Sequence, residues 1–378
     1  MKADVAIVGA GPSGCSVALE LVRLGRSVVV VTRDDPHAAR MFGECLPPAA
    51  NVALSRLQLP APDPKHHLPS FGNVSSWGRA DATSNDFIFN PHGHGWHLDR
   101  ARFDASLRES VECRGVTILT GTTGERITRN RDSVLVIPLA GSSVSALAAR
   151  WLIDCSGRGA YVACRMDARI EGTDRLVAFA AMALSGTDRD ADCSTLTEAV
   201  PDGWWYTVRL TNGRRIVAFH TDGDLPACQA VRHRQGFLDL LEQTRHIKAR
   251  MAGYVVPEHF PVPLAAGGRW LKKAFGEGWV AVGDAAQSYD PLSSQGLASA
   301  LESGIRAAFA VNAALDGDYR HLERYQMMLE LQRARYQRLR SQIYGLERRW
   351  PESMFWLRLL PRSDRSDSRA QTVVTARP

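Results

Sequence analysis

The stretch ADVAIVGAGPSG, residues 3–14, decides the fold. A short apolar run ends in the pattern Gly9-x-Gly11-x-x-Gly14, and a helical pattern of apolar residues follows it. A second valine-rich run, SVVVVT, then covers residues 27–32. Continuous apolar runs of this kind are typical of buried parallel strands. The stretch therefore predicts a βαβ unit at the start of the chain.

The three glycines also predict a ligand. In this pattern Gly9 permits a tight turn, Gly11 lets the backbone approach a pyrophosphate, and Gly14 lets the helix pack on the strand. The helix that begins at Pro12 and Ser13 turns its N-terminus toward the anion, because its backbone N–H groups and dipole favour negative charge. We expect a dinucleotide to bind here.

The end of the second strand departs from the dinucleotide pattern. An acidic residue normally stands there and binds the adenosine ribose. This chain has Thr32 instead, with Arg33 next to it and Asp34 beyond. The threonine hydroxyl or Asp34 could take over the ribose contact, so the ribose-binding residue stays open.

Length and composition bound the architecture and the class of protein. A chain of 378 residues suits two domains, or one domain with a large insertion. The 46 basic and 40 acidic residues are interspersed, which argues against a dedicated nucleic-acid binder. The seven cysteines are scattered without a CxxC pair, as reduced thiols are. We find neither a signal peptide nor an apolar run of roughly 20 residues, and we expect a cytoplasmic protein without a membrane span.

Two later segments repeat the change from strand to turn. LIDCSGRGA, residues 152–160, is typical of a strand that ends at Asp154 and enters a Gly/Ser turn. WVAVGDAAQSYDPLSSQG, residues 279–296, combines a strand, a Gly-Asp pair, a loop and the start of a helix. Shorter alternating segments from about 161 to 265 predict an antiparallel sheet.

Taken in order, these motifs resemble a known family. The N-terminal GxGxxG and the pattern GDAA…DPxxxxG near residue 290 are similar to FAD-dependent monooxygenases of the para-hydroxybenzoate hydroxylase fold. Flavin-dependent halogenases and geranylgeranyl reductases share that fold. The resemblance implies an α/β protein with a Rossmann-like FAD-binding domain of the para-hydroxybenzoate hydroxylase and glutathione reductase type. An inserted antiparallel-sheet substrate domain and C-terminal helices complete the expected architecture.

The resemblance also implies domain boundaries. We expect a discontinuous FAD-binding domain over residues 1–75, 96–160 and 270–315, and a substrate domain over residues 76–95 and 161–269. A C-terminal helical region would cover residues 316–362, and a disordered polar tail residues 363–378.

Several FAD contacts follow from the resemblance. In the family the aspartate of the Gly-Asp pair, here Asp284, hydrogen-bonds the ribityl chain, and Asp154 backs the adenine side. The helix after the Asp-Pro turn points its N-terminus at the flavin, where its dipole stabilises negative charge on the reduced ring. Arg100 stands where the family places an arginine on the FAD phosphate; the alternative is a surface arginine. The predicted cofactor residues are Gly9, Gly11, Pro12, Ser13, Gly14, Thr32, Arg33, Glu44, Cys45, Arg100, Asp154, Gly283, Asp284, Pro291, Ser294, Gln295 and Gly296.

The segment FGECLPPAA, residues 42–50, resembles a GESLPP-type segment that lies near the flavin in halogenase-like members. Glu44 and the following prolines would fix this loop against the flavin ring. Cys45 stands where serine is usual. We leave open whether Cys45 is reactive, forms a covalent link to FAD, or is only a small neutral residue.

The histidine-rich stretch NPHGHGWHLDRARFD, residues 90–104, has the appearance of a metal site. However, His92 and His94 alternate with glycines in a turn, and no acidic or cysteine partners cluster there. We therefore expect no metal. In the fold of the family this stretch leads into the helix at Arg100, and Trp96 or His97 would lie on the substrate side.

The candidate catalytic residues are His97, Trp205 and His220, and Trp204 and Tyr206 are further candidates for the substrate side. A histidine there would act as a base toward an indole N–H or a phenol. The alternative is that both tryptophans pack the sheet and His220 is satisfied within its strand.

Two departures argue against halogenation. Tryptophan halogenases carry a WxWxIP motif, whereas this chain has GWWYTVRL without the Ile-Pro pair. They also use a lysine beyond the GES-type segment, whereas residues 70–90 contain Arg79 and no lysine. The whole set of motifs resembles the narrower LodB/GoxB/QhpG-like group, which hydroxylates a tryptophan side chain of a partner protein.

The resemblance implies a reaction. Reduced FAD and O2 would form a C4a-hydroperoxide that hydroxylates an electron-rich aromatic of the tryptophan or tyrosine type, peptidyl or carrier-bound. No second GxGxxG is visible, so NAD(P)H would bind transiently, or a separate flavin reductase would supply electrons. The alternatives are a halogenase, an FAD dehydrogenase or reductase, and a non-enzymatic flavin-containing maturation factor. The arginine-rich segment 319–350 predicts a helix with either a solvated face or a docking face for a partner protein.

Overall fold

The computed structural model describes residues 1–33, 44–120, 127–129, 135–138, 146–172, 174–186 and 190–359. Asp34, the first two residues of the segment 42–50 and the predicted disordered tail 363–378 lie outside the described residues.

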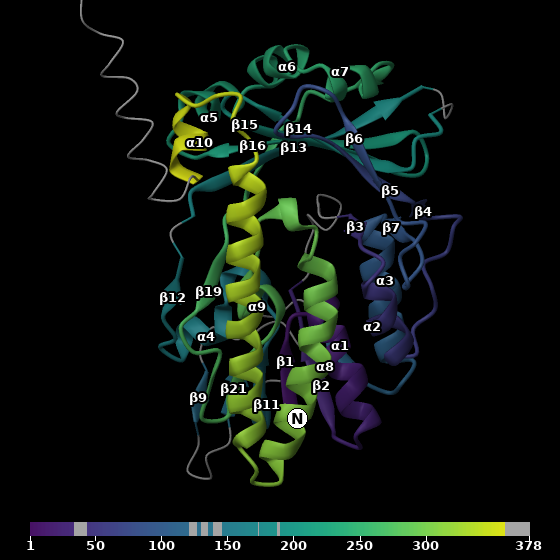
Figure 1. The fold of residues 1–378 in the computed structure, drawn as a ribbon. Helices are drawn as coiled ribbons and strands as arrows, with labels where there is room; N and C mark the ends of the chain where they lie inside the picture. Colours follow the sequence, from purple (N-terminus) through teal and green to yellow (C-terminus); the bar gives the residue numbers. More distant parts are fainter. Residues whose placement is uncertain are drawn as a thin grey trace, which may run out of the picture. The chain divides into compact units, whose positions relative to one another are not determined.

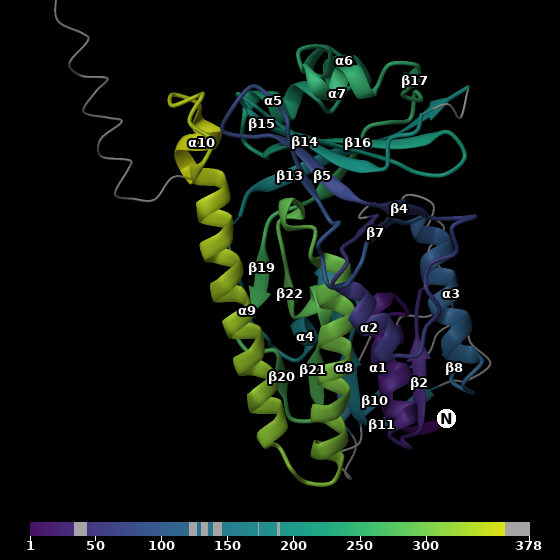
Figure 2. The ribbon, with the colours of Figure 1, turned by 45° about the vertical axis from the view of Figure 1, so that its right-hand side comes forward.

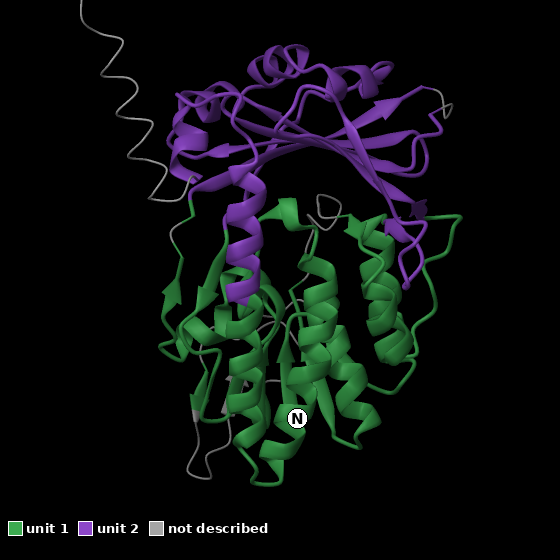
Figure 3. Ribbon diagram, viewed as in Figure 1, with its two compact units in different colours: residues 1–66, 98–174, 268–332 green, residues 67–97, 175–267, 333–378 purple. Residues whose placement is uncertain are grey.

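The chain forms two compact units, which Figure 3 colours separately. The first unit contains residues 1–66, 98–174 and 268–332, and the second contains residues 67–97, 175–267 and 333–378. The domain limits expected from the sequence differ from these in places, for example over residues 161–174, and they stay a prediction.

A mixed sheet with a parallel core forms the centre of the first unit. Its strands lie in the order β20-β21-β11-β1-β2-β8, and β1, β2, β8, β11 and β21 pair in parallel. The strand bounds are β20 Phe275–Gly276, β21 Trp279–Ala281, β11 Ala146–Asp154, β1 Lys2–Val8, β2 Val28–Val31 and β8 Thr117–Leu119. All four valines of β2 are buried, as the continuous apolar run predicted. The predicted βαβ unit is confirmed.

Two helices of the first unit pack side by side, α1 (Pro12–Arg23) and α8 (Gly296–Leu315) (Figure 1). Ser16 of α1 donates a hydrogen bond of 2.7 Å to the backbone oxygen of Leu301 in α8. Small residues at this contact allow the close approach. The remaining elements of this unit are the helices α2 (Ala50–Arg56), α3 (Arg100–Glu112) and α4 (Tyr161–Arg165), and the short strands β3 (Cys45–Leu46), β9 (Thr128–Arg129), β10 (Leu135–Pro138), β12 (Ile170–Glu171), β19 (Arg269–Leu271) and β22 (Gln287–Ser288).

The glycine-rich turn between β1 and α1 has no room for side chains at two positions. Gly9 has a φ of +110°, and a Cβ there would lie 2.2 Å from the backbone oxygen of Cys155. A Cβ on Gly14 would lie 1.9 Å from the backbone oxygen of Gly9. The turn therefore depends on glycine at both positions for backbone-to-backbone contact.

An antiparallel sheet forms the centre of the second unit and confirms the predicted change of pattern. Its strands lie in the order β17-β13-β16-β15-β14-β5-β6, with β18 beside β13 and one parallel pair, β14 with β5. The strand bounds are β17 Tyr254–Val255, β13 Leu176–Ser185, β16 Arg214–Asp222, β15 Gly203–Arg209, β14 Ser194–Val200, β5 Gly72–Ser76, β6 Thr83–Asp86 and β18 Val262–Ala265. The strands β4 (Leu68–Ser70) and β7 (Gly95–His97) pair separately.

Helices cover one face of this antiparallel sheet: α5 (Pro226–Ala230), α6 (Arg234–Glu242) and α7 (His246–Arg250) (Figure 2). Glu198 of β14 fixes the start of α7. Its carboxylate accepts three backbone N–H groups, from Arg245, His246 and Ile247, at 2.8–2.9 Å. A buried carboxylate thus replaces a side-chain cap and ties the helix to the sheet.

The predicted C-terminal helices are α9 (Arg320–Gly345) and α10 (Met354–Leu359). In the first unit, Tyr325 of α9 donates to the backbone oxygen of Ala281 at 3.0 Å. In the second, Trp356 of α10 donates to the backbone oxygen of Val200 at 3.0 Å. The predicted fold class, a parallel-sheet α/β domain with an antiparallel sheet and C-terminal helices, is confirmed.

All seven cysteines are free thiols. Within the described ranges, no helix has the length and apolar character needed to cross a membrane.

Candidate functional site

The first turn of α1 is open to an anion. Gly11 occupies the N-cap, and no described side chain caps the helix. A Cβ on Gly11 would meet nothing within 4 Å, in contrast to Gly9 and Gly14. The backbone N–H groups that follow Pro12 and Ser13 are the donors that helix starts offer to phosphate groups.

The start of α8 is a second open helix N-terminus. Gln295 is its N-cap residue and provides no side-chain cap, and Gly296 is exposed. The preceding turn is held by Asp290, whose carboxylate accepts from the backbone N–H of Leu292 at 2.9 Å across Pro291. Ser294 then takes a left-handed conformation with a φ of +49°. The Asp-Pro turn thus leads into α8, and the predicted direction of its N-terminus toward the flavin stays a prediction.

Asp154, at the end of β11, holds the following turn by hydrogen bonds. One carboxylate oxygen accepts from the backbone N–H and the hydroxyl of Ser156, at 3.0 and 2.6 Å. The other accepts from the backbone N–H of Ala163 at 2.8 Å. The side chain is fully buried. It organises the Gly/Ser turn, and its predicted role beside the adenine stays a prediction.

Asp284 lies in a positively charged environment. It follows β21 in the short helix Gly283–Ala285 and is half-buried. Burial raises the pKa of Asp284 above its ordinary value. Three arginines oppose that shift through their positive charge: Arg158, Arg100 and Arg269. The positive charge around this one carboxylate is what an anionic cofactor requires.

The buried polar atoms without a hydrogen-bond partner among the described residues include a pair near Asp284. They are Nη2 of Arg269 and the hydroxyl oxygen of Ser288. The two residues are direct partners across the antiparallel pair of β19 and β22. Buried polar atoms are nearly always satisfied, so this pair favours a ligand that offers hydrogen-bond acceptors. Ser288 lies within the predicted motif of residues 279–296 but is not among the predicted cofactor residues, and Arg269 lies outside every predicted motif.

The remaining predicted cofactor residues have mixed positions. Thr32 extends β2 by one bond, since its N–H donates to the backbone oxygen of Leu119 at 2.9 Å, and Arg33 is exposed. Glu44 is buried, and Cys45 is half-buried in β3. Arg100 begins α3 and forms an ion pair of 3.1 Å with Asp104 one turn later.

The predicted catalytic tryptophan is a packing residue of the second unit. Trp205 is fully buried, and the centre of its ring lies 4.9 Å from the ring centre of Phe219 and 4.9 Å from that of Phe237 in α6. It therefore lies on the face of the sheet that the helices cover. A catalytic role for Trp205 stays a prediction.

The neighbouring position has the opposite orientation, because side chains alternate along a strand. Trp204 stacks on His220 of β16, with 3.6 Å between the ring centres and 3° between the planes. Its indole N–H donates to the hydroxyl of Tyr344 at 3.0 Å. Trp204, Tyr206 and His220 thus belong to the face of the sheet opposite α6.

His97 is buried at the end of β7. Its Nε2 lies 3.2 Å from the hydroxyl of Thr195 in β14. Burial lowers the pKa of His97 to about 3, and burial likewise lowers the pKa of His220 to about 3. Both imidazoles are therefore neutral near pH 7.

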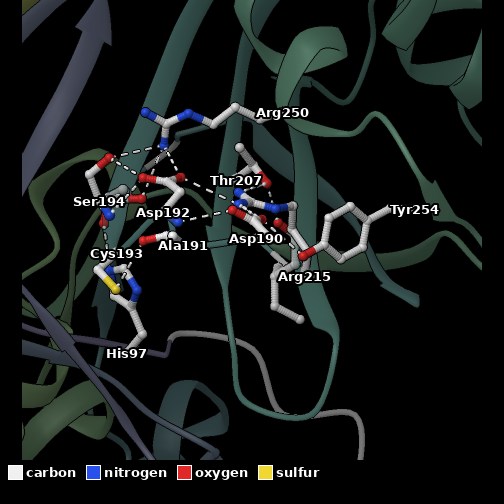
Figure 4. A network of polar contacts seen from close by, with 12 residues as sticks. His97, Asp190, Ala191, Asp192, Cys193, Ser194, Thr207, Arg215, Arg250 and Tyr254 are labelled. Carbon is white, nitrogen blue, oxygen red and sulfur yellow. Dashed lines mark hydrogen bonds and ion pairs between the residues drawn. The ribbon is translucent and has the colours of Figure 1, made fainter. Parts of the chain in front are cut away.

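A cluster of charges surrounds Arg215 of β16 in the second unit (Figure 4). Nη2 of Arg215 lies 2.5 Å from Asp190 and 3.3 Å from Asp192. Arg250 also pairs with Asp192, and Tyr254 donates to Asp190 at 2.9 Å. Two positive and two negative groups balance each other here, and the sequence did not predict this cluster.

The histidine-rich stretch is split between environments. His92 is exposed, His94 is half-buried against Trp96, with 4.8 Å between the ring centres, and His97 is buried. In the part of the chain that the structure describes, no group of three or more His, Cys, Asp or Glu side chains is arranged to hold a metal ion.

The class of protein follows from the dinucleotide turn, the two open helix starts and the arginines around Asp284. A profile of FAD dependent oxidoreductases matches residues 4–43, and the profile of the tryptophan halogenases matches residues 33–377. The chain therefore belongs to the tryptophan halogenase family of FAD-dependent enzymes. The residues present fit FAD, because the orphaned buried donors and uncapped helix starts meet its acceptor-rich phosphates and flavin ring.

One relative is LodB of Marinomonas mediterranea, named as an FAD-dependent oxidoreductase, with 26% identity over 362 residues that cover 94% of this chain and 96% of LodB. The solved flavin-dependent halogenase CmlS superimposes with a TM-score of 0.83 at 20% identity, over 100% of this chain and 71% of CmlS. The peptidyl tryptophan dihydroxylase QhpG superimposes with a TM-score of 0.69 at 22% identity, over 95% of this chain and 79% of QhpG. The predicted kinship with flavin halogenases and with LodB and QhpG is confirmed at the level of the family.

Proposed function

We propose that this protein hydroxylates an electron-rich aromatic group of the tryptophan or tyrosine type, held in a peptide or on a carrier. It would use FAD reduced by NAD(P)H or by a separate flavin reductase. The likeness to a peptidyl tryptophan dihydroxylase and the full-length similarity to LodB support this reading.

The position of Arg79 is the observation that favours hydroxylation over halogenation. It is the only basic residue between residues 70 and 90, where the halogenase pattern has its lysine. Arg79 is exposed in the turn between β5 and β6, and its backbone oxygen accepts from the hydroxyl of Ser76 at 3.2 Å. An exposed arginine has no buried ammonium to offer as a carrier of oxidised halide.

The residues of the second unit would bind and orient the aromatic ring. We assign this role to His97, His220 and Trp204. A pKa of about 3 makes each imidazole a hydrogen-bond acceptor for an indole N–H or a phenol, rather than a group that holds a proton at neutral pH. Thr195 fixes the ring of His97, and the stack on Trp204 fixes that of His220.

The residues of the first unit would bind FAD. When bound and reduced, FAD supplies the activation of O2. The starts of α1 and α8 would offer backbone N–H donors and positive dipole ends to its negative groups. We assign Arg100, Arg158 and Arg269 to its anionic groups and Asp284 to a hydroxyl of the ribityl chain. No residue has to act as a nucleophile in this proposal.

Halogenation is the second candidate, and the family profile favours it directly. The superposition with a flavin-dependent halogenase over the whole chain supports the same candidate. The two candidates differ in the atom added to the ring, which makes them easy to separate.

The experiment compares product masses. The purified protein is incubated with FAD, a flavin reductase, NADH and tryptophan-containing peptides, in buffers with and without chloride or bromide. Hydroxylation adds the mass of oxygen atoms and does not depend on halide. A halogen isotope pattern that appears only with halide would replace hydroxylation by halogenation. NADH oxidation that never responds to a substrate would favour the non-enzymatic maturation factor.

A further inference from the structure

The second half of α9 carries an exposed apolar stripe. Leu339, Ile343 and Leu346 are 38%, 39% and 64% exposed. Leu339 and Ile343 lie one turn apart on the same side of the helix, and Leu346 follows directly after its last residue, Gly345. Arg335 lies one turn before Leu339 on the same side, and Arg338, the residue next to Leu339, is also exposed. We call these five residues the α9 face.

Residues beside these positions fix the helix to the second unit. Tyr336 and Tyr344 are buried, and Tyr344 accepts from Trp204. The indole N–H of Trp77 donates to the backbone oxygen of Ile343 at 2.7 Å. The helix therefore presents its exposed stripe in one orientation, and a partner would not have to order it first.

The charge of this segment is one-sided. Between Leu331 and Leu346 the chain has four arginines and no acidic residue. Solvated helices usually balance such charges, as Arg306 and Glu302 do in α8 at 3.1 Å. No carboxylate among the described residues pairs with Arg335 or Arg338. Two like charges one turn apart destabilise a helix slightly, so an acidic partner would relieve them.

We propose that the α9 face docks an acidic amphipathic helix of a partner protein. Two aliphatic side chains one turn apart, with Leu346 just beyond the helix end, suit the apolar stripe of another helix. The flanking guanidinium groups suit carboxylates, which they bind through two parallel hydrogen bonds. A second copy of this chain does not fit, because it would bring arginines against arginines. The docking itself does not depend on the proposed reaction. Only the idea that the docked partner delivers a protein-borne aromatic group rests on the proposed function.

The test measures binding and needs no turnover, so it is independent of the reaction. The probe is a fluorescently labelled peptide of roughly 20 residues, with leucines at helical spacing flanked by glutamates. A peptide of the same composition in scrambled order is the reference. By fluorescence anisotropy with the full-length holoprotein, we expect the amphipathic peptide to bind at least about tenfold tighter than the scrambled one. Equal binding of the two peptides would overturn the proposal.

Variants locate the site. Arg335→Glu with Arg338→Glu should weaken binding by at least about tenfold. The matched control, Lys65→Glu with Arg232→Glu, makes the same change in net charge at exposed positions elsewhere and should stay within about twofold. Leu339→Ser with Leu346→Ser should remove the preference for the amphipathic peptide. All substituted side chains are exposed, and thermal unfolding checks that each variant folds.

Two outcomes contradict the site. If the control pair weakens binding as much as the arginine pair, net charge alone is responsible. If the protein binds vesicles of anionic phospholipid through Arg335 and Arg338 but not the amphipathic peptide, the surface is a membrane contact instead.

Discussion

Two arginines with buried guanidinium atoms, Arg215 and Arg269, differ in what surrounds them. The side chain of Arg215 in the second unit is 1% exposed, and its Nη2 lies within ion-pair distance of Asp190 and Asp192. Nη2 of Arg269 in the first unit is buried with no hydrogen-bond partner in the described chain, next to an equally unsatisfied Ser288. Nε of Arg215 also has no hydrogen-bond partner among the described residues, so the contrast lies in the carboxylates that face Arg215. A charge that the fold itself pairs with carboxylates serves stability. A charge that the fold leaves unsatisfied indicates a ligand.

The largest effect should come from Arg215→Ala. Removing this guanidinium leaves Asp190 and Asp192 without their buried partner, and the expected loss is about 3–5 kcal/mol in the free energy of unfolding. Urea unfolding followed by tryptophan fluorescence measures it. The exposed Arg232→Ala should change the stability by no more than about 0.5 kcal/mol. If Arg215→Ala instead weakens FAD binding and leaves stability unchanged, the contrast with Arg269 is wrong.

The difference between the two units also explains what the sequence could predict. The dinucleotide turn was predictable because its determinants, Gly9, Gly11 and Gly14, lie within one short segment and each is required by local backbone geometry. The charge cluster of Arg215 was not, because its partners come from other parts of the chain. Their proximity depends on the register of the sheet.

Register also decided the outcome for the two adjacent tryptophans. Trp204 and Trp205 look alike in the sequence, and a shift by one residue would exchange their faces. Only the pairing of β15 with β16 shows that Trp204 stacks on His220 while Trp205 packs against Phe237. In the same way, Arg158 and Arg269 belong to no shared motif, and their approach to Asp284 required the fold.

A smaller effect should appear as pH dependence, again in the second unit. Burial holds the pKa of His97 and of His220 at about 3, below the value of about 6.5 in an unfolded chain. Stability from these neutral histidines is complete above pH 6.5 or so and is lost as the pH falls toward 3, because only the unfolded state then takes up protons. Between pH 7 and pH 5 each histidine should cost about 2 kcal/mol.

His220→Gln isolates one of these contributions. Unfolding free energies at the two pH values should differ by about 2 kcal/mol less in the variant than in the parent. An unchanged difference would mean that His220 is protonated in the folded protein. The charges of Asp192, Arg215 and Arg250 also act on the pKa of His97, so the contribution of His97 to the pH dependence should change when Arg215 is replaced. The pKa of His220 is lowered by burial, and apart from that only a hydrogen bond to the backbone of Trp204 acts on it.

The smallest effect, on Arg269, decides the comparison. Arg269→Gln removes a charged donor that we assign to FAD, and a hydrogen bond of a charged group is worth about 1.5 kcal/mol or more, which is roughly tenfold in affinity. Titration of the apoprotein with FAD, followed by flavin fluorescence, measures this loss. The thermal midpoint of the apoprotein should stay the same or rise, because the substitution removes a buried donor that nothing in the fold satisfies. Ser288→Ala should act in the same direction and more weakly, since its hydroxyl is neutral. If Arg269→Gln lowers the stability of the apoprotein and leaves FAD affinity intact, Arg269 serves the fold as Arg215 does, and the site needs another anion-binding group.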